Sequence, residues 1–163
     1  SRMVPGVAIL IPMYIIMRRL MLVDTILSLI IVHISFSLPF AIWMLRAYFE
    51  SIPRDIEEAA LVDGCSRIGA IFRVILPLSV PGLIVTGIFC FMTSWNDFLF
   101  ALVLTNTKAA LTAPVVASMF ITEFYTDYGL LTAVTVLAAI PPVTLALIFQ
   151  KYIVKGLTLG WGK

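Results

Sequence analysis

Charged residues are scarce in this sequence. Of its 163 residues, 12% are Asp, Glu, Lys or Arg and 61% are hydrophobic, whereas a soluble domain carries about 25% charged residues. Such a deficit cannot cover a globular surface with solvated groups, so the composition excludes an ordinary soluble domain. The net charge of +2 is small and the basic residues are scattered, so nucleic-acid binding is not indicated. The composition predicts an integral membrane protein.

Cysteine and histidine are almost absent. Cys65 lies in a polar stretch and Cys90 in an apolar run, so two free thiols are expected rather than a disulfide. His33 is the only histidine, which leaves no cluster of metal ligands. The sequence also lacks the G-x-x-x-x-G-K-S/T loop that holds nucleotide phosphates, and no nucleophile–base pair stands out. We therefore expect no catalytic residue, no metal and no cofactor on this chain.

Three runs of 21 to 23 residues contain no Asp, Glu, Lys or Arg: 25–45, 74–96 and 128–149. At about 1.5 Å per residue, each run as a helix is roughly 30 Å long, the thickness of one hydrocarbon core. These runs predict three membrane spans in an all-α fold. Pro39 and the Pro141-Pro142 pair are expected to bend the first and the third.

The segments outside these runs are shorter. Residues 3–17 are uncharged but too short to span a bilayer, and Pro5, Gly6 and Pro12 are expected to interrupt them. We interpret them as the end of a preceding helix and an interfacial segment, and therefore expect the chain to be the C-terminal part of a longer one. Residues 105–127 form a mixed connection, in which residues 113–121 are predicted to form a short helix.

A polar stretch separates the first two runs. Residues 53–77 have the sequence PRDIEEAALVDGCSRIGAIFRVILP. Pro53 is favoured in the first turn of a helix, and Ser51 is expected to cap that helix. Acidic residues follow at once, as a helix N-terminus favours: Asp55, Glu57 and Glu58. The helix is expected to run to Val62 and to end at Gly64 in a left-handed conformation.

A second helix is expected after this turn. Ser66 is a favoured cap, and four apolar residues follow at helical spacing: Ile68, Ile71, Phe72 and Ile75. Leu76 and Pro77 then return the chain to the membrane. The stretch therefore predicts a helix–turn–helix that lies outside the bilayer, between two spans.

The spacing inside this stretch is specific. Glu58-Ala59-Ala60 is followed after three residues by Gly64, and after nine more by Val74-Ile75-Leu76-Pro77. This pattern resembles the EAA loop of bacterial ABC-importer permeases, with Val74 where the family has Ile. Further segments resemble the carbohydrate-uptake branch, which includes the maltose, glycerol-phosphate and polyol permeases: Pro12-Met13-Tyr14, Leu38-Pro39-Phe40, Ser51-Ile52-Pro53, Ser94-Trp95-Asn96-Asp97-Phe98 and Gly156-Leu157-Thr158-Leu159-Gly160. The final Trp161-Gly162-Lys163 departs from the small-residue ending that is usual in the family.

The resemblance implies a fold and a function. It implies the C-terminal part of the type I importer permease fold: one membrane domain over residues 1–163, with about three full spans, a preceding helix end and a cytoplasmic coupling loop at residues 50–77. It implies import of a sugar or polyol across the bacterial inner membrane, by a subunit that is not itself an enzyme. The implied partners are a second homologous permease, an ATPase dimer that binds ATP and Mg²⁺, and an extracytoplasmic solute-binding protein.

The resemblance also assigns residues. The coupling loop would sit in a cleft of the ATPase and be moved by it, with Glu58 as an acidic contact, Ala59-Ala60 as a close-packing spot and Gly64 as the turn. The residues that the resemblance places at this contact are Glu57, Glu58, Ala59, Ala60, Asp63, Gly64, Leu76 and Pro77. The alternative is an amphipathic loop that touches no partner.

The distribution of Lys and Arg indicates the orientation, because cytoplasmic segments carry more of them. With the loop and the C-terminus inside, seven basic residues are cytoplasmic: Arg46, Arg54, Arg67, Arg73, Lys151, Lys155 and Lys163. Arg18, Arg19 and Lys108 are then outside, and Arg2 can lie on either side. The Arg18-Arg19 pair goes against the rule.

Polar residues at membrane depth are candidates for the translocation path. Asp97 follows the uncharged second run and can face a cavity, with Asn96 as a partner for sugar hydroxyls and Trp95 as a stacking face. His33 lies mid-span and can line the same path. The competing interpretation is that these residues hold neighbouring helices together.

Three other functions remain open. The chain can be an ABC permease for another solute, such as phosphate, an amino acid or a peptide. It can be a secondary transporter, which usually has paired charges at membrane depth, where this chain has only Asp97 and His33. It can also be a membrane scaffold that transports nothing. The outer loop is either a contact for a solute-binding protein or simply solvated, and its polar residues are Glu123, Tyr125 and Asp127.

Overall fold

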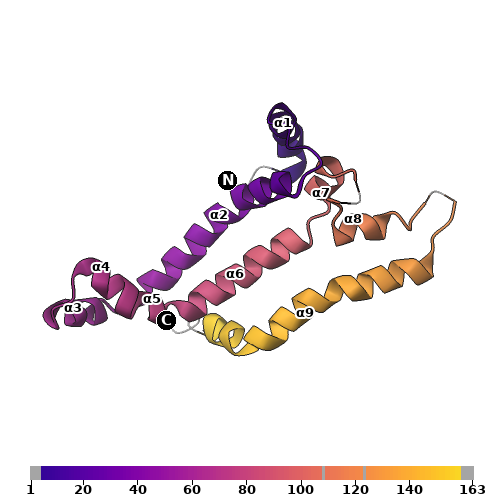
Figure 1. Cartoon of the computed structure of the whole chain (residues 1–163). Coiled ribbons are helices and arrows are strands. Elements are labelled where there is room, and N and C mark those ends of the chain that lie inside the picture. Colours follow the sequence, from indigo (N-terminus) through magenta and orange to yellow (C-terminus); the bar gives the residue numbers. More distant parts are fainter. Residues whose placement is uncertain (1–4, 108, 123, 159–163) are drawn as a thin grey trace. The chain divides into compact units, whose positions relative to one another are not determined.

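The computed structural model describes residues 5–107, 109–122 and 124–158, with side chains up to residue 152 (Figure 1). Its helices are α1 Gly6–Arg19, α2 Ile26–Glu50, α3 Arg54–Val62, α4 Arg67–Ala70, the π-helical η1 Ile71–Ile75, α5 Leu76–Leu78, α6 Val80–Trp95, α7 Leu99–Leu104, α8 Ala113–Ser118 and α9 Tyr128–Thr158. Within the described residues, β-pairing is limited to one isolated bridge between Ile121 and Thr126. The all-α prediction is confirmed. The expectations for Lys108, Glu123, Lys163 and the end of the tail lie outside the described residues.

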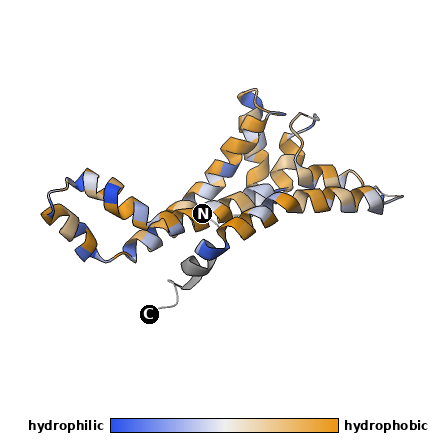
Figure 2. Cartoon of the chain, turned by 60° about the horizontal axis from the view of Figure 1, so that its bottom comes forward, coloured by the Kyte–Doolittle hydropathy of each residue, from blue (hydrophilic) through white to orange (hydrophobic). Residues whose placement is uncertain are grey.

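Among the residues that the structure describes, two helices are long and apolar enough to cross a membrane, Ile26–Glu50 and Tyr128–Tyr152. A third span is possible as a broken one, because the helical segments Arg67–Leu78 and Val80–Trp95 meet at an angle of 66°. Figure 2 shows hydrophobic residues along most of the long helices. The first and third predicted spans are therefore single long helices, and the second is divided by the bend, after which α6 begins at Val80.

Helix α1 differs from its prediction. It runs without a break from Gly6 to Arg19 and carries Pro12 inside it, so the expected interruption at Pro12 is wrong. Packing provides the reason, because tertiary contacts commonly override helix propensity. The side chain of Met17 is 1% exposed, and a Cβ added at Gly6 would meet the side chains of Leu99 and Phe100 at about 4 Å.

The chain divides into two compact units. The first contains residues 1–39 and 92–144, and the second contains residues 40–91 and 145–163. The core of the first unit brings together α1, α2, α7 and α8, and its buried members are Met17, Leu29, Val32, Phe100, Ala101, Leu104 and Val115. The rings of Phe36 and Phe100 meet there at 5.1 Å between centroids.

Asp24 fastens the loop after α1 to the end of α7. Its backbone has a φ of 65°, which Asp tolerates better than most residues. Its carboxylate Oδ1 accepts hydrogen bonds from the backbone N–H of Asn106 at 2.7 Å and of Thr107 at 2.8 Å. Its own N–H donates to the carbonyl of Leu104 at 2.7 Å. One residue therefore closes the loop between two helices of the first unit.

Asp24→Asn is expected to lower the thermal stability of the protein at neutral pH. The backbone N–H groups of Thr107 and Asn106, in that order, hold the pKa of Asp24 below its ordinary value. A lowered carboxyl pKa stabilises the fold above the unfolded pKa, and this contribution is lost as the pH falls through the folded pKa. The difference in Tm between wild type and variant should therefore vanish in acid. Asp55→Asn, at an exposed carboxylate of α3, serves as the control, and a pH-independent difference would contradict the charge argument.

Candidate functional site

The polar hairpin consists of α3, the turn after it and α4, residues 54–70, in the second unit (Figure 1). The turn is closed by two backbone bonds, from Gly64 N–H to the Leu61 carbonyl at 3.1 Å and from Cys65 N–H to the Ala60 carbonyl at 3.0 Å. Gly64 has a φ of 87°. These are the two bonds of a Schellman cap. The predicted end of the first helix and its glycine turn are confirmed.

The two predicted helix caps have different outcomes. Ser66 does cap α4, since its Oγ accepts the N–H of Gly69 at 3.1 Å. Ser51 does not cap α3, which begins after Pro53 without a side-chain cap. The Ser51 hydroxyl donates instead to the carbonyl of Tyr48 at 2.6 Å. The prediction for Ser51 was wrong because the unpaired carbonyls at the end of α2 compete for the same side chain.

Gly64→Val is expected to destabilise the polar hairpin. A β-branched residue at positive φ costs about 1–3 kcal/mol, and no atom of the described residues lies within 4 Å of an added Cβ, so the backbone conformation decides the effect. Gly64→Asn is the matched control, because Asn tolerates this conformation. Thermal unfolding of the purified protein measures the effect. Equal Tm values for the Val and Asn variants would show that the turn is not constrained.

Most of the residues assigned to partner contact are exposed in this chain. They are Glu57, Glu58, Ala59, Asp63, Gly64, Leu76 and Pro77. Ala60 differs, because it is 6% exposed and packs inside its own unit. Ala59 is therefore the alanine of the pair that another surface can reach.

Three apolar side chains in this part of the chain are also exposed. Val62 is 86%, Ile68 69% and Phe72 65% exposed. Ile68 and Phe72 belong to the apolar set that was predicted at helical spacing, and the chain itself leaves them uncovered. Adjacent exposed apolar side chains mark surfaces that bind other proteins or membranes.

A hollow of about 680 Å³ lies between the end of α2, the start of α3 and η1. Its lining residues are Phe49, Glu50, Ile52, Pro53, Arg54, Glu57, Ile71 and Ile75. Neighbouring helix positions are turned by about 100°. Glu57 therefore faces this hollow, whereas Glu58, which does not line it, is directed elsewhere from the same helix.

A polar cluster in the first unit joins α2, α6 and α7. His33 Nδ1 lies 2.7 Å from Ser94 Oγ, and His33 Nε2 lies 3.3 Å from Asp97 Oδ2. Nε2 is buried and has no hydrogen bond of good geometry within the described residues, so its approach to the carboxylate is an electrostatic contact. Asp97 Oδ2 also accepts the N–H of Ala101 at 3.1 Å. The side chains of His33 and Asp97 are 18% and 16% exposed.

Trp95 and Asn96 do not join this cluster. The indole Nε1 of Trp95 donates to the carbonyl of Ala138 in α9 at 3.0 Å. Asn96 is exposed in the turn after α6, and its Nδ2 donates to the carbonyl of Met92 in α6 at 2.8 Å. The structure therefore brings together His33 and Asp97 of the four candidate path residues and adds Ser94. The spacing of three between Ser94 and Asp97 was the signal available in the sequence.

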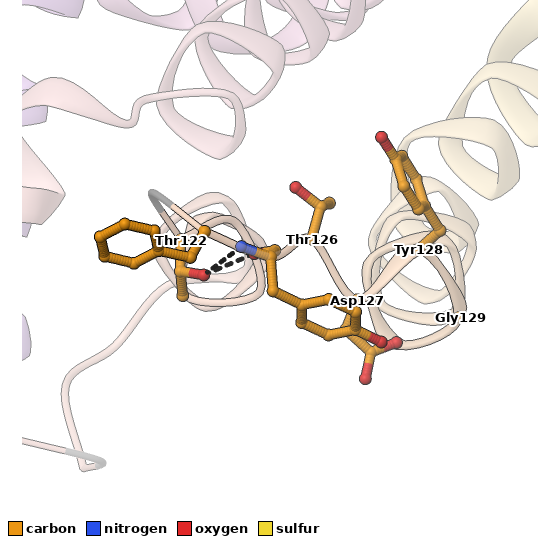
Figure 3. Close-up of a pocket in the computed structure, with 7 residues that line it drawn as sticks. Thr122, Thr126, Asp127, Tyr128 and Gly129 are labelled. Carbon is orange, nitrogen blue, oxygen red and sulfur yellow. Dashed lines mark hydrogen bonds between the residues drawn. The ribbon is translucent and has the colours of Figure 1, made fainter.

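The loop before α9 forms a hollow of about 540 Å³ (Figure 3). Thr122 Oγ1 accepts the N–H of Tyr125 at 3.1 Å, and Asp127 Oδ1 accepts the N–H of Leu130 at 3.0 Å at the start of α9. The exposed fractions of Phe124 and Tyr125 are 96% and 68%. Hydrogen bonds therefore hold the backbone of the loop, and its two aromatic rings are exposed.

Comparison with known proteins gives one family. Residues 1–159 match the family described as "Binding-protein-dependent transport system inner membrane component". Residue identity is 43% over 160 residues with the trehalose transport system permease protein SugB of Mycobacterium tuberculosis, covering 97% of this chain and 58% of that protein. It is 42% over 156 residues with the sulfoquinovosyl glycerol transport system permease protein SmoH of Agrobacterium fabrum, covering 96% and 55%. The chain thus spans little more than half the length of these relatives.

Proposed function

The chain belongs to the family of binding-protein-dependent transport system inner membrane components, and we propose that it is part of the permease subunit of an ATP-driven importer of a sugar or polyol. The observation that carries the proposal is the polar hairpin, an ordered helical pair with exposed acidic and apolar residues that follows the membrane-length helix α2. The sugar assignment is supported by relatives whose names specify trehalose and sulfoquinovosyl glycerol.

In this proposal the polar hairpin and the C-terminus face the cytoplasm of a bacterium, and the apolar helices cross its inner membrane. The hairpin docks on an ATPase dimer, which alone binds ATP and Mg²⁺, so this chain is not an enzyme and binds no cofactor. A second homologous permease completes the pathway. The uneven distribution of basic residues supports the orientation.

In this proposal the polar hairpin moves as a rigid body with the partner that binds it. Motion passes from one protein to another only through elements that keep their shape. The Schellman turn at Gly64 and the cap at Ser66 fix α3 against α4, while Glu58, Ala59 and the apolar Val62 remain open to a partner. An exposed acidic residue beside small and apolar ones suits a cleft with a basic rim.

The solute side of the proposal involves two regions. His33, Trp95, Asn96 and Asp97 are proposed to border the translocation path, where His33 and Asp97 also hold α2 to α7. The loop of residues 122–129, with its exposed aromatic rings, is proposed to meet the extracytoplasmic solute-binding protein. Aromatic side chains are enriched at protein interfaces, which supports this assignment.

Capture of the ATPase tests the proposal. The full-length protein, tagged and solubilised in mild detergent, should co-purify with an ATPase that carries the phosphate-binding loop, and proteoliposomes of the complex should import the solute only with ATP inside. An ABC permease for another solute would still co-purify with the ATPase but would not import sugars. If no ATPase is captured and uptake follows an ion gradient, the chain is a secondary transporter and the proposal is wrong.

A further inference from the structure

Tyr48 packs directly on Gly82 inside the second unit. A Cβ added at Gly82 would lie 2.6 Å from Cδ2 and 2.7 Å from Cδ1 of the Tyr48 ring, far inside the van der Waals limit. Gly82 is buried. The Tyr48 hydroxyl also donates a long hydrogen bond of 3.5 Å to the carbonyl of Leu78. The ring of one helix therefore fits a position of the other that only glycine can occupy.

The backbone bends just before Gly82. The helical segments that end at Leu78 and begin at Val80 meet at 66°. Pro77 and Pro81 donate no backbone hydrogen bond there, and the N–H of Leu76 reaches back five residues to Ile71. Prolines and π-helical turns are the usual causes of helix kinks. Ser79 bridges the bend, because its N–H donates to the carbonyls of Ile75 and Leu76 at 3.0 Å and its carbonyl accepts the N–H of Leu83 at 2.9 Å. The bend is the place in this connection where a change of angle would absorb a movement of the polar hairpin.

The other connection of the hairpin is the end of α2. Tyr48 lies in its last turn, and its carbonyl accepts both the hydroxyl of Ser51 at 2.6 Å and the N–H of Ser51 at 3.1 Å. The same residue thus ends the helix before the hairpin with its backbone and contacts the helix after the hairpin with its ring. The ring contact therefore links the end of α2 directly to the start of α6, the two helices on either side of the hairpin in the sequence.

We propose that the Tyr48–Gly82 contact is a positioning joint, which prevents the bend before α6 from absorbing the movement of the polar hairpin. The proposal rests on the proposed function, since it requires the hairpin to be moved by a partner. It assigns no solute contact and no ATPase contact to Tyr48 or Gly82. The contact makes α6 move together with the hairpin. Without it, ATP is hydrolysed without the movement of α6 that transport requires.

The test uses the complete transporter in proteoliposomes and measures ATP hydrolysed per solute imported. Gly82→Ala forces the ring away, and Tyr48→Ala removes it. Gly87→Ala is the matched control, because it lies in the same helix and an added Cβ meets no atom within 4 Å. Tyr48→Phe keeps the ring and loses only the long hydrogen bond.

Gly82→Ala and Tyr48→Ala should each raise the ATP used per solute by about tenfold, within the range of typical coupling energies between sites. Gly87→Ala and Tyr48→Phe should leave the ratio unchanged. A purely structural role would lower uptake and ATP hydrolysis together at a constant ratio, and that result in Tyr48→Ala overturns the proposal even if Gly82→Ala does not fold. A wild-type complex that captures no ATPase would instead defeat the proposed function.

Discussion

Glu58→Lys is expected to reduce ATP-driven uptake by at least about 30-fold, the lower end of the cost of losing a hydrogen-bonded charge at an interface. Glu58 is exposed on α3 and does not line the hollow that Glu57 faces, so its carboxylate is free to meet a partner. A lysine there would repel the basic rim that the proposal requires on the ATPase. Uptake of labelled solute into proteoliposomes and the amount of ATPase retained on the tagged permease measure the effect.

The control for Glu58→Lys must distinguish loss of the partner contact from loss of stability of α3. Acidic residues near a helix N-terminus stabilise the helix by interaction with its dipole, so charge reversal weakens α3 at any of these positions. Asp55→Lys lies one turn nearer the N-terminus and carries at least the same helical cost. Loss of uptake in both variants would point to helix stability, and full uptake with Glu58→Lys would remove Glu58 from the contact.

The elements that the sequence predicted well are local. Gly64 and Ser66 have the predicted roles because a left-handed glycine and a cap depend on a few neighbouring residues. The first and third uncharged runs became helices of membrane length, because composition largely determines that property. The family resemblance rested on spacing within residues 58–77 and agrees with the family match over residues 1–159.

The features that the sequence did not predict depend on contacts between distant residues. The link between Asp24 and Asn106 joins positions 82 residues apart, and the contact of His33 with Ser94 joins positions 61 apart. Pro12 was expected to break α1, but packing against α7 keeps the helix intact. The periodicity of one helix does not show which residues of another helix it contacts. The packing of Tyr48 on Gly82 therefore could not be predicted from the sequence.

Asp97→Ala is expected to lower the stability of the membrane domain by about 1–3 kcal/mol, the cost of leaving buried polar groups without their partner. The substitution removes the acceptor of the Ala101 N–H and the carboxylate that faces His33 Nε2. Both groups lie where water is scarce, so neither finds a substitute. The Tm of the purified protein in detergent measures the loss, and Asp97→Asn should lose less because its amide oxygen can still accept from Ala101.

A double-mutant cycle distinguishes two roles of His33 and Asp97, holding α2 to α7 and binding solute. If His33 and Asp97 mainly hold α2 to α7, His33→Ala should cost far less in the Asp97→Ala background than in wild type, with a coupling of about 0.5–3 kcal/mol. Solute affinity would then stay the same in every variant that folds. If Asp97 binds solute, Asp97→Asn should instead raise the concentration needed for half-maximal uptake at an unchanged Tm. The 3.3 Å approach of His33 to Asp97 and their low exposure favour the first outcome, because two side chains that face each other have little surface left for a sugar.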